Sequence, residues 1–371
     1  MSKFHVSCLA LLLCSPALGW ARQSASPEGI AAQPEAVPAP QAPALTTRPA
    51  PAPAAAEGRM KLDVVVTDKS GRPVSGLELK DFTLLDNNQP SKILSFHAID
   101  GIVQKANPPV EVILLIDTVN LPVFRVGFVR QEFEKFLRQN GGHLAQPVSI
   151  FWFTSEGVNV RRLPSTDGNA LVAELNRADS NSLAISRSGR EYDDIQHLAL
   201  SVQGLTAIAQ AEAKKPGRKL LIWAGHGWPM LDNRRVQASS KVQQNYFDSI
   251  VELSTKLREA RISLYNTSFA EPGPATLLYG DFLKGVKSPE KAMPPNLALR
   301  VLATQSGGRV LGPDNDLAGQ INSCVQDASA FYTLSFDPPR ADRANEYHDL
   351  KVLIGKPGLV ARTNTGYYNQ P

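Results

Sequence analysis

The middle of the chain contains short hydrophobic runs that alternate with longer amphipathic stretches. The runs 112–116, 148–153 and 220–223 are almost wholly apolar, as is typical of parallel strands covered on both faces. Between them, stretches such as 126–139 place their apolar side chains on one side of a helix. We therefore predict an α/β fold over residues 109–328, with a doubly wound, mostly parallel sheet between two layers of helices.

The segments before and after this region have a different pattern, in which hydrophobic and polar residues alternate. This period of two is typical of strands that bury one face. Neither set is large enough to form a sandwich alone, so we expect residues 59–104 and 329–371 to build one β-sandwich around the inserted α/β region. Two unrelated flanking hairpins are the alternative. Extended segments are predicted at 61–66, 74–77, 82–85, 93–98, 331–336, 349–354 and 359–362.

The first residues have the pattern of an export signal. A positive charge at Lys3 precedes an apolar run, 6–13, which is too short to span a bilayer. Small residues then stand at the −3 and −1 positions of a cleavage site after Ala21. We therefore expect residues 1–21 to be a cleaved signal peptide and the mature protein to be periplasmic, secreted or held at the cell surface. An uncleaved anchor is the alternative.

Residues 22–58 consist mostly of alanine and proline and contain almost nothing large and apolar. Such a segment cannot offset the entropy cost of ordering, so we predict a disordered, extended linker. It either holds the folded part away from a surface or is a structureless N-terminus without a role of its own. No transmembrane segment is expected after the signal peptide.

Charge and cysteine content narrow the picture further. The net charge of +4 comes from 39 basic and 35 acidic residues, which is too mild and too evenly spread for a nucleic-acid-binding protein. Two of the three cysteines, Cys8 and Cys14, lie in the predicted signal peptide. The mature chain would keep only Cys324, which cannot form an internal disulfide and is expected to be a small core residue.

The sequence motifs of several common enzyme classes are absent. There is no G-x-S-x-G elbow, and the histidines are too isolated for an H-E-x-x-H zinc site. The glycines at 280–285 have the spacing of a P-loop but lack the Lys-Ser/Thr that should follow. The triplet Asp314-Asn315-Asp316 could contact calcium, although a turn that caps the next helix is the simpler interpretation.

Candidate site residues remain at the end of the first central strand. Ligands bind at the carboxyl ends of the strands in a doubly wound sheet, which is where Asp117, Thr118 and Asn120 lie. His226 and Trp228 follow the third buried strand and reach the same edge. These five residues are the candidates for binding a partner. Alternatively, Asp117 caps the following helix, and His226 and Trp228 pack a loop.

Several short pieces of sequence follow one another in a specific order. They are 64–68 with Gly71 and Pro73, then Asp81-Phe82, 114–120, 217–223, 347–352, 357–359 and 366–368. Together they resemble a von Willebrand factor A domain, and more closely the VWFA-related proteins that are abundant in acidobacteria. The resemblance covers nearly everything after the linker, and it implies the same α/β fold.

This resemblance also implies a Mg²⁺ site, made of a D-x-S-x-S strand end, a threonine and a second aspartate, and often completed by a partner's carboxylate. Asp117 fits, but Val119 and Leu121 stand where the serines belong. The third strand ends without an aspartate, and Ser186 and Ser188 are the nearest hydroxyls to the expected threonine. Mg²⁺ needs about six oxygens, so we predict a degenerate site without a cofactor, with Asp117 as the one remaining metal-ligand candidate.

These observations favour an exported, non-enzymatic binding or adhesion-type module. We expect it to contact a protein or glycan partner at the cell envelope through the carboxyl edge of the α/β sheet. Two alternatives stay open: a periplasmic hydrolase that uses carboxylates and His226, and a structural component of the envelope.

Overall fold

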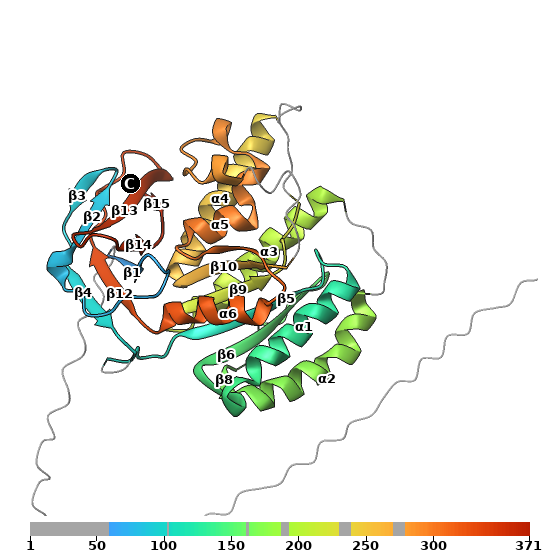
Figure 1. Ribbon diagram of the computed structural model, residues 1–371. Helices are drawn as coiled ribbons and strands as arrows, with labels where there is room; N and C mark the ends of the chain where they lie inside the picture. The colour runs from blue at the N-terminus through green and yellow to red at the C-terminus, as the bar shows by residue number, and fades with distance from the viewer. Residues whose placement is uncertain (1–58, 102–103, 161–162, 187–192, 230–238, 270–278) are drawn as a thin grey trace, which may run out of the picture. The chain divides into compact units, whose positions relative to one another are not determined.

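A computed structural model describes the chain from Arg59 to Pro371 (Figure 1). Its gaps are 102–103, 161–162, 187–192, 230–238 and 270–278, and the side chains of 178–186 are also not described. The predicted signal peptide and linker lie outside the described residues. Within the described part, no helix is both long and apolar enough to cross a membrane.

A seven-stranded sheet forms the centre of the α/β segment. The strand order is β11-β10-β9-β5-β6-β7, and β8 pairs with the first half of β6. The five strands from β11 to β6 are parallel, while β7 and β8 run antiparallel to β6. The chain therefore has a mixed α/β fold with a mostly parallel sheet. The strands are β5 (Glu111–Asp117), β6 (His143–Thr154), β7 (Gly157–Val158), β8 (Ser165–Asp167), β9 (Lys219–Ala224), β10 (Ile262–Ser268) and β11 (Val310–Pro313).

Helices cover both faces of this sheet, which explains why its strands are hydrophobic throughout. Along β5, Leu114 packs into one hydrophobic cluster, and its neighbours Ile113 and Leu115 pack into the other. The first cluster includes residues of α1 (Val123–Leu137), α2 (Gly168–Ser186) and α6 (Leu317–Val325). The second includes residues of α3 (Asp194–Glu212), α4 (Ser240–Glu259) and α5 (Leu299–Gln305). Short 3₁₀ helices are η1 (Leu79–Asp81), η2 (Gln139–Gly142), η4 (Pro289–Lys291), η5 (Pro294–Leu297) and η6 (Gln326–Ala328).

The strands on the two sides of the α/β segment pair with one another in two antiparallel sheets. One has the order β14-β1-β12-β4, and the other has the order β15-β13-β2-β3. Each sheet therefore combines strands from before and after the α/β segment, which is consistent with the predicted β-sandwich. The strands are β1 (Met60–Thr67), β2 (Phe82–Asp86), β3 (Gln89–Ser91), β4 (Ser95–Ile99), β12 (Phe331–Phe336), β13 (Glu346–Ile354), β14 (Val360–Arg362) and β15 (Gly366–Asn369).

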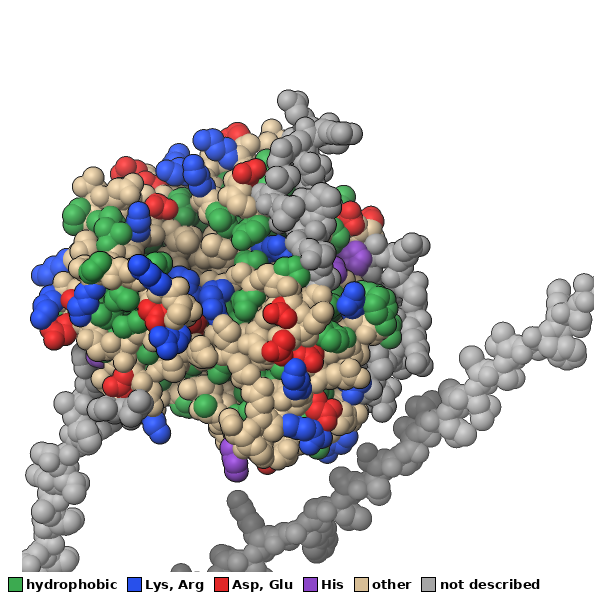
Figure 2. All heavy atoms as spheres, in the orientation of Figure 1, with side chains coloured by type: hydrophobic (Ala, Val, Ile, Leu, Met, Phe, Trp, Pro, Cys, Tyr) green, Lys and Arg blue, Asp and Glu red, His purple; other side chains and the backbone are tan. Residues whose placement is uncertain are grey.

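The two antiparallel sheets share one hydrophobic cluster. Leu62 and Val64 of β1 contribute to it from one sheet, and Leu84 of β2 and Val352 of β13 contribute from the other. The alternation in the sequence is therefore the alternation between this core and the outer face of each sheet. Over the face seen in Figure 2, basic and acidic side chains are interspersed, in line with the small net charge.

Some local details differ from the sequence predictions. Residues 74–77 form no strand, although the Val74 N–H donates to the Val66 carbonyl at 2.8 Å. Asp167 ends β8 and caps α2 by accepting a hydrogen bond from the Ala170 N–H at 3.0 Å. The short strands β3, β8 and β15 were not predicted.

Two predictions about single residues agree with the structure. Asp316 is the N-cap of α6, and its carboxylate accepts a hydrogen bond from the Gly319 N–H at 3.1 Å. Cys324 is fully buried in the same helix, and burial raises the pKa of its thiol to about 12. Such a thiol is not ionised near neutral pH, so a core role suits it.

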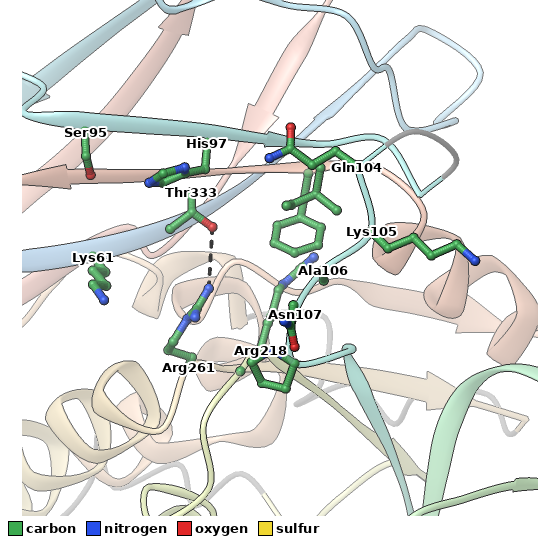
Figure 3. Close-up of a pocket in the computed structure, with 14 residues that line it drawn as sticks. Lys61, Ser95, His97, Gln104, Lys105, Ala106, Asn107, Arg218, Arg261 and Thr333 are labelled. Carbon is green, nitrogen blue, oxygen red and sulfur yellow. Dashed lines mark hydrogen bonds between the residues drawn. The ribbon is translucent and has the colours of Figure 1, made fainter. Parts of the chain in front are cut away.

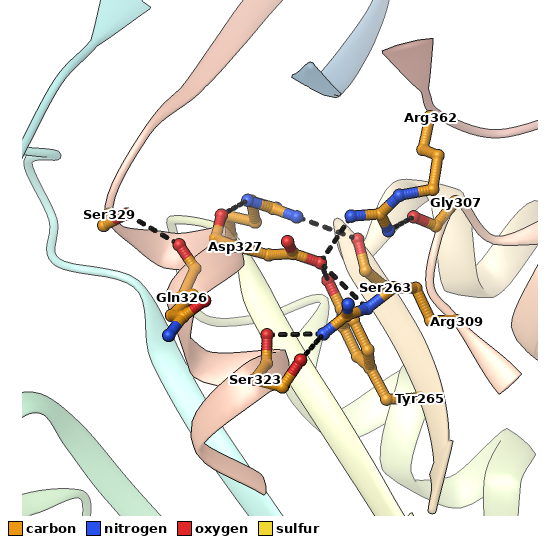
Figure 4. Close-up of polar contacts among 10 residues, drawn as sticks. Ser263, Tyr265, Gly307, Arg309, Ser323, Gln326, Asp327, Ser329 and Arg362 are labelled. Carbon is orange, nitrogen blue, oxygen red and sulfur yellow. Dashed lines mark hydrogen bonds and ion pairs between the residues drawn. The ribbon is translucent and has the colours of Figure 1, made fainter. Parts of the chain in front are cut away.

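A buried aspartate in η6 links the α/β segment to the antiparallel sheets (Figure 4). Asp327 Oδ2 accepts hydrogen bonds from the Tyr265 hydroxyl of β10 and from Arg362 Nη2 of β14, both at 2.8 Å. Arg309 Nε lies 3.8 Å from the same oxygen, and Arg218 donates to the Asp327 main-chain carbonyl at 2.7 Å. This group, Asp327 with its four partners, is called the junction cluster below.

Candidate functional site

The carboxyl edge of the parallel sheet is built around the end of β5. Asp117 is the last residue of this strand, and its side chain is completely buried. Thr118 follows and prolongs the contact with β6, because both its N–H and its hydroxyl donate to the Phe153 carbonyl at 2.9 Å. The hydrogen bonds of the strand thus continue one residue beyond it and fix where the chain turns away.

Both carboxylate oxygens of Asp117 are used by N–H donors. Oδ1 accepts from the main-chain N–H groups of Val119 and Asn120, each at 2.9 Å. Oδ2 accepts from the Asn120 side-chain amide at 2.8 Å and from the Trp223 indole at 2.9 Å. Asp117 therefore anchors the turn after β5 and ties it to β9.

Asp117 does not cap the following helix, so that prediction was wrong. The N-cap position of α1 is Pro122, and no side chain caps it. The main-chain donors that Asp117 binds belong to Val119 and Asn120, which precede the helix. An aspartate that accepts from the N–H groups two and three residues ahead is typical of a turn, and the sequence alone did not separate the two roles.

Burial has a clear electrostatic effect on this carboxyl group. The loss of water around Asp117 raises its pKa above the usual range, and the N–H donors of Asn120, Trp223 and Val119 oppose this rise. Within the described residues, no ion pair reaches the Asp117 carboxylate. The group is stabilised by dipoles rather than by a neighbouring cation.

The donors around Asp117 do not suit a magnesium ion. Mg²⁺ is held by oxygen lone pairs, whereas Asp117 already gives both of its oxygens to N–H groups that would have to leave. In the part of the chain that the structure describes, no group of three or more His, Cys, Asp or Glu residues could hold a metal ion. The Ser186 side chain and Ser188 lie outside the described residues.

The hydrogen bonds of Asn120 extend from Asp117 to helix α3. Its amide nitrogen donates to the Ser201 hydroxyl at 3.0 Å, and its amide oxygen lies 3.0 Å from His197 Nδ1. Ser201 is fully buried, so the bond lies inside the protein. The structure thus joins Asp117 and Asn120 to Trp223, Ser201 and His197, three residues that the sequence analysis did not select.

Among the described residues, Trp228 contacts this group through Trp223, whereas no hydrogen bond joins His226 to it. Trp228 is 3% exposed and packs edge-to-face on Trp223, with ring centroids 5.5 Å apart. Its indole nitrogen Nε1 is buried, and no described residue forms a hydrogen bond with it. His226 is partly exposed, and burial lowers its pKa. The positive charges of Arg300 and Arg125 lower this pKa further, whereas the negative charge of Asp117 raises it.

The hydrolase alternative requires a carboxylate in hydrogen-bond contact with His226. Among the described residues no such bond is formed. A histidine–carboxylate pair does occur elsewhere: His348 Nδ1 lies 2.8 Å from Asp86 Oδ1, but both side chains are buried. The second oxygen of Asp86 accepts from the Tyr367 hydroxyl at 2.6 Å, so this pair holds β2, β13 and β15 together.

Apolar side chains are exposed where α1 begins, beside the Asp117 turn. Phe124 is 72% exposed and Val123 is 43% exposed. The Arg125 guanidinium lies over the Phe124 ring at 5.4 Å and over the Phe269 ring at 5.3 Å. The exposed ring of Phe124 and the guanidinium of Arg125 therefore lie together at the start of α1.

Comparison with known proteins gives only a fold-level likeness. No family model matches the chain, and no curated protein sequence matches it. Among solved structures, the crystal structure of the human COPII-coat protein Sec24c aligns with 71% of this chain at 11% sequence identity and a TM-score of 0.33. The alignment covers 43% of the Sec24c chain, so the present chain matches less than half of that protein's length.

Of the residues that the sequence analysis did not select, Ser201 could have been found from a weak pattern in the sequence. Side chains two apart on a strand share a face, so Asp117 lies on the same face of β5 as Ile113 and Leu115. That face is covered by α3, where Ser201 interrupts the apolar side. A polar residue on the buried side of the covering helix was therefore the available indication of a partner near Asp117.

Proposed function

We propose that this protein is an exported, non-catalytic binding module whose α/β segment is a von Willebrand factor A-like domain. It contacts a protein or glycan partner at the cell envelope through the carboxyl edge of the parallel sheet. Export is supported by the sequence pattern of residues 1–21, and the domain type by the mixed α/β fold together with the order of the sequence pieces.

The observation that carries this proposal is the exposure of Phe124 at 72%, beside Val123, in the first turn of α1, which follows this edge. Large apolar side chains that project into water from the start of a helix provide binding energy when a partner covers them. In the proposed surface, Phe124 and Val123 make the contact together with the partly exposed Thr118, Asn120 and His226. Asp117 and Trp228 are buried, so they support this surface from beneath.

Two buried donors near this edge favour an acidic group on the partner. Arg300 is 7% exposed, and its Nε and Nη2 have no hydrogen-bond partner among the described residues; burial lowers its pKa. The preceding residue, Leu299, packs against Gly227, which directly follows His226, so Arg300 belongs to a helix that begins beside this edge. A carboxylate brought by the partner would satisfy the guanidinium and offset its desolvation.

The test immobilises the protein and measures how much of a partner it recovers from cell-envelope extracts, for variants at two exposed apolar residues. Phe124→Ala should abolish the recovery of a partner by the immobilised protein, because it removes the largest exposed ring at the edge. Leu79→Ala is the matched control, since Leu79 is 46% exposed but lies in η1, outside the α/β segment. Equal recovery by the wild type and Phe124→Ala would refute this surface.

A further inference from the structure

A second candidate site lies at the opposite end of the parallel sheet. A cavity of about 340 Å³ is bounded on one side by β1, β4 and β12 and on the other by the turns that lead into β9 and β10 (Figure 3). Its lining residues Lys61, His97 and Thr333 alternate along their strands with core residues such as Leu62 and Leu334. The cavity therefore lies against the outer face of the β14-β1-β12-β4 sheet.

The lining of this cavity is strongly basic. Lys61, Lys105, Arg218 and Arg261 all contribute to it, and none of the described lining residues is acidic. Only Arg261 has a carboxylate partner in the described part of the chain: its Nη2 and Nε lie 2.6 and 3.0 Å from the oxygens of Asp63. Three positive charges on the lining are therefore left without a balancing carboxylate.

Arg218 is the most informative of these cations because it is 2% exposed. Its guanidinium lies over the Phe331 ring at 4.7 Å and donates to the Asp327 carbonyl at 2.7 Å. Its Nε is buried and has no hydrogen-bond partner in the part of the chain that the structure describes. A buried guanidinium without a carboxylate carries a desolvation cost, which a negative charge in the adjoining cavity would offset.

The free cations indicate what kind of anion would fit. Arg261 already uses its planar fork on Asp63, so it offers no free bidentate site for a carboxylate. What remains free are the ammonium groups of Lys61 and Lys105, which are exposed point charges. Point charges favour the anion with the highest charge density, and a phosphate carries more charge at pH 7 than a carboxylate does.

We propose that this cavity binds a small molecule bearing phosphate groups, with Lys61 and Lys105 contacting the phosphate and Arg218 stabilising it from beneath. The volume lies near the lower end of the range for small-molecule sites, which is roughly 300–1,000 Å³. It therefore suits a ligand such as a sugar phosphate rather than a polymer. This site is separate from the proposed partner surface, and neither depends on the other.

Calorimetric titration of the full-length protein with inorganic pyrophosphate at low ionic strength tests the proposal. We expect saturable binding with one site per chain. Lys61→Gln and Lys105→Gln should each raise the Kd by about three- to fivefold, the effect expected for an exposed charge pair. The matched control is Lys92→Gln, because Lys92 is exposed but does not line the cavity.

Further titrants decide the class of ligand. Glucose 6-phosphate should bind with the same dependence on Lys61 and Lys105, whereas citrate should bind more weakly than pyrophosphate. Citrate binding as tight as that of pyrophosphate would overturn the phosphate assignment. Absence of saturable binding, or an equal weakening by Lys92→Gln, would overturn the site itself.

Discussion

Two fully buried aspartates show how differently this protein compensates the same side chain. Asp327, in the junction cluster, contacts the guanidinium groups of Arg362 and Arg309 and the hydroxyl of Tyr265. Asp117, at the carboxyl edge, contacts only uncharged N–H donors, two from the main chain and two from side chains. One carboxylate is held by charge and the other by dipoles.

This difference shows that the place of an aspartate in the fold does not by itself determine what the aspartate does. Asp117 is the residue for which the sequence resemblance implied a role as a metal ligand, yet its oxygens fix a turn and connect it to β9. Asp327 has no place in any motif of the sequence, yet it joins η6, β10 and β14. What separates the two is the charge of the groups around them.

Removing the charge of Asp327 should have the largest effect on stability. In Asp327→Asn, Arg362 and Arg309 lose their shared carboxylate while their own charges stay largely buried. We expect the free energy of unfolding to fall by about 3 kcal/mol, measured by urea denaturation. Asp337→Asn is the control, because its pair with Arg59 is exposed and should contribute nothing measurable. Equal stability of Asp327→Asn and the wild type would show that the arginines do not depend on this carboxylate.

The corresponding change at Asp117 should cost less, because it leaves no cation unpaired. In Asp117→Asn, the new amide NH₂ replaces one of the two carboxylate oxygens. It must then face N–H donors, either those of the Val119 and Asn120 main chain or those of the Asn120 and Trp223 side chains, so donors meet without an acceptor. We expect a loss of about 2 kcal/mol in the same urea experiment, typical of a buried donor left unsatisfied. If Asp117→Asn lowered the free energy of unfolding more than Asp327→Asn does, the proposed order of the two aspartates would be wrong.

The smallest effect concerns pH at the carboxyl edge. Burial lowers the pKa of His226 below its usual 6.5, so the unfolded chain binds this proton more readily than the folded protein. The wild type should therefore lose stability as the pH falls from 6.5 toward the lowered value. His226→Gln should lack this part of the pH dependence, which urea denaturation at a series of pH values measures. Identical pH profiles would exclude a contribution from His226.

The sequence predicted regular patterns better than polar contacts. The apolar run of β5 and the amphipathic pattern of α1 are found in the structure within a few residues, since burial on both faces or on one face leaves a period in the sequence. The hydrogen bonds of Asp117 and Asn120 were not predictable in the same way, because Trp223 lies 106 residues from Asp117 and Ser201 lies 81 residues from Asn120. Trp223 was seen only as an apolar strand residue, although its indole N–H is the contact that matters.

The most direct test of the account is whether Asp117 binds a metal ion. The full-length protein would be titrated calorimetrically with Mg²⁺, Mn²⁺ and Ca²⁺, and Asp117→Ala would serve as the control. If the four N–H donors occupy the carboxylate as described, no heat of binding should depend on Asp117. Saturable binding that disappears in Asp117→Ala would contradict the account, because it would mean that a cation displaces those donors.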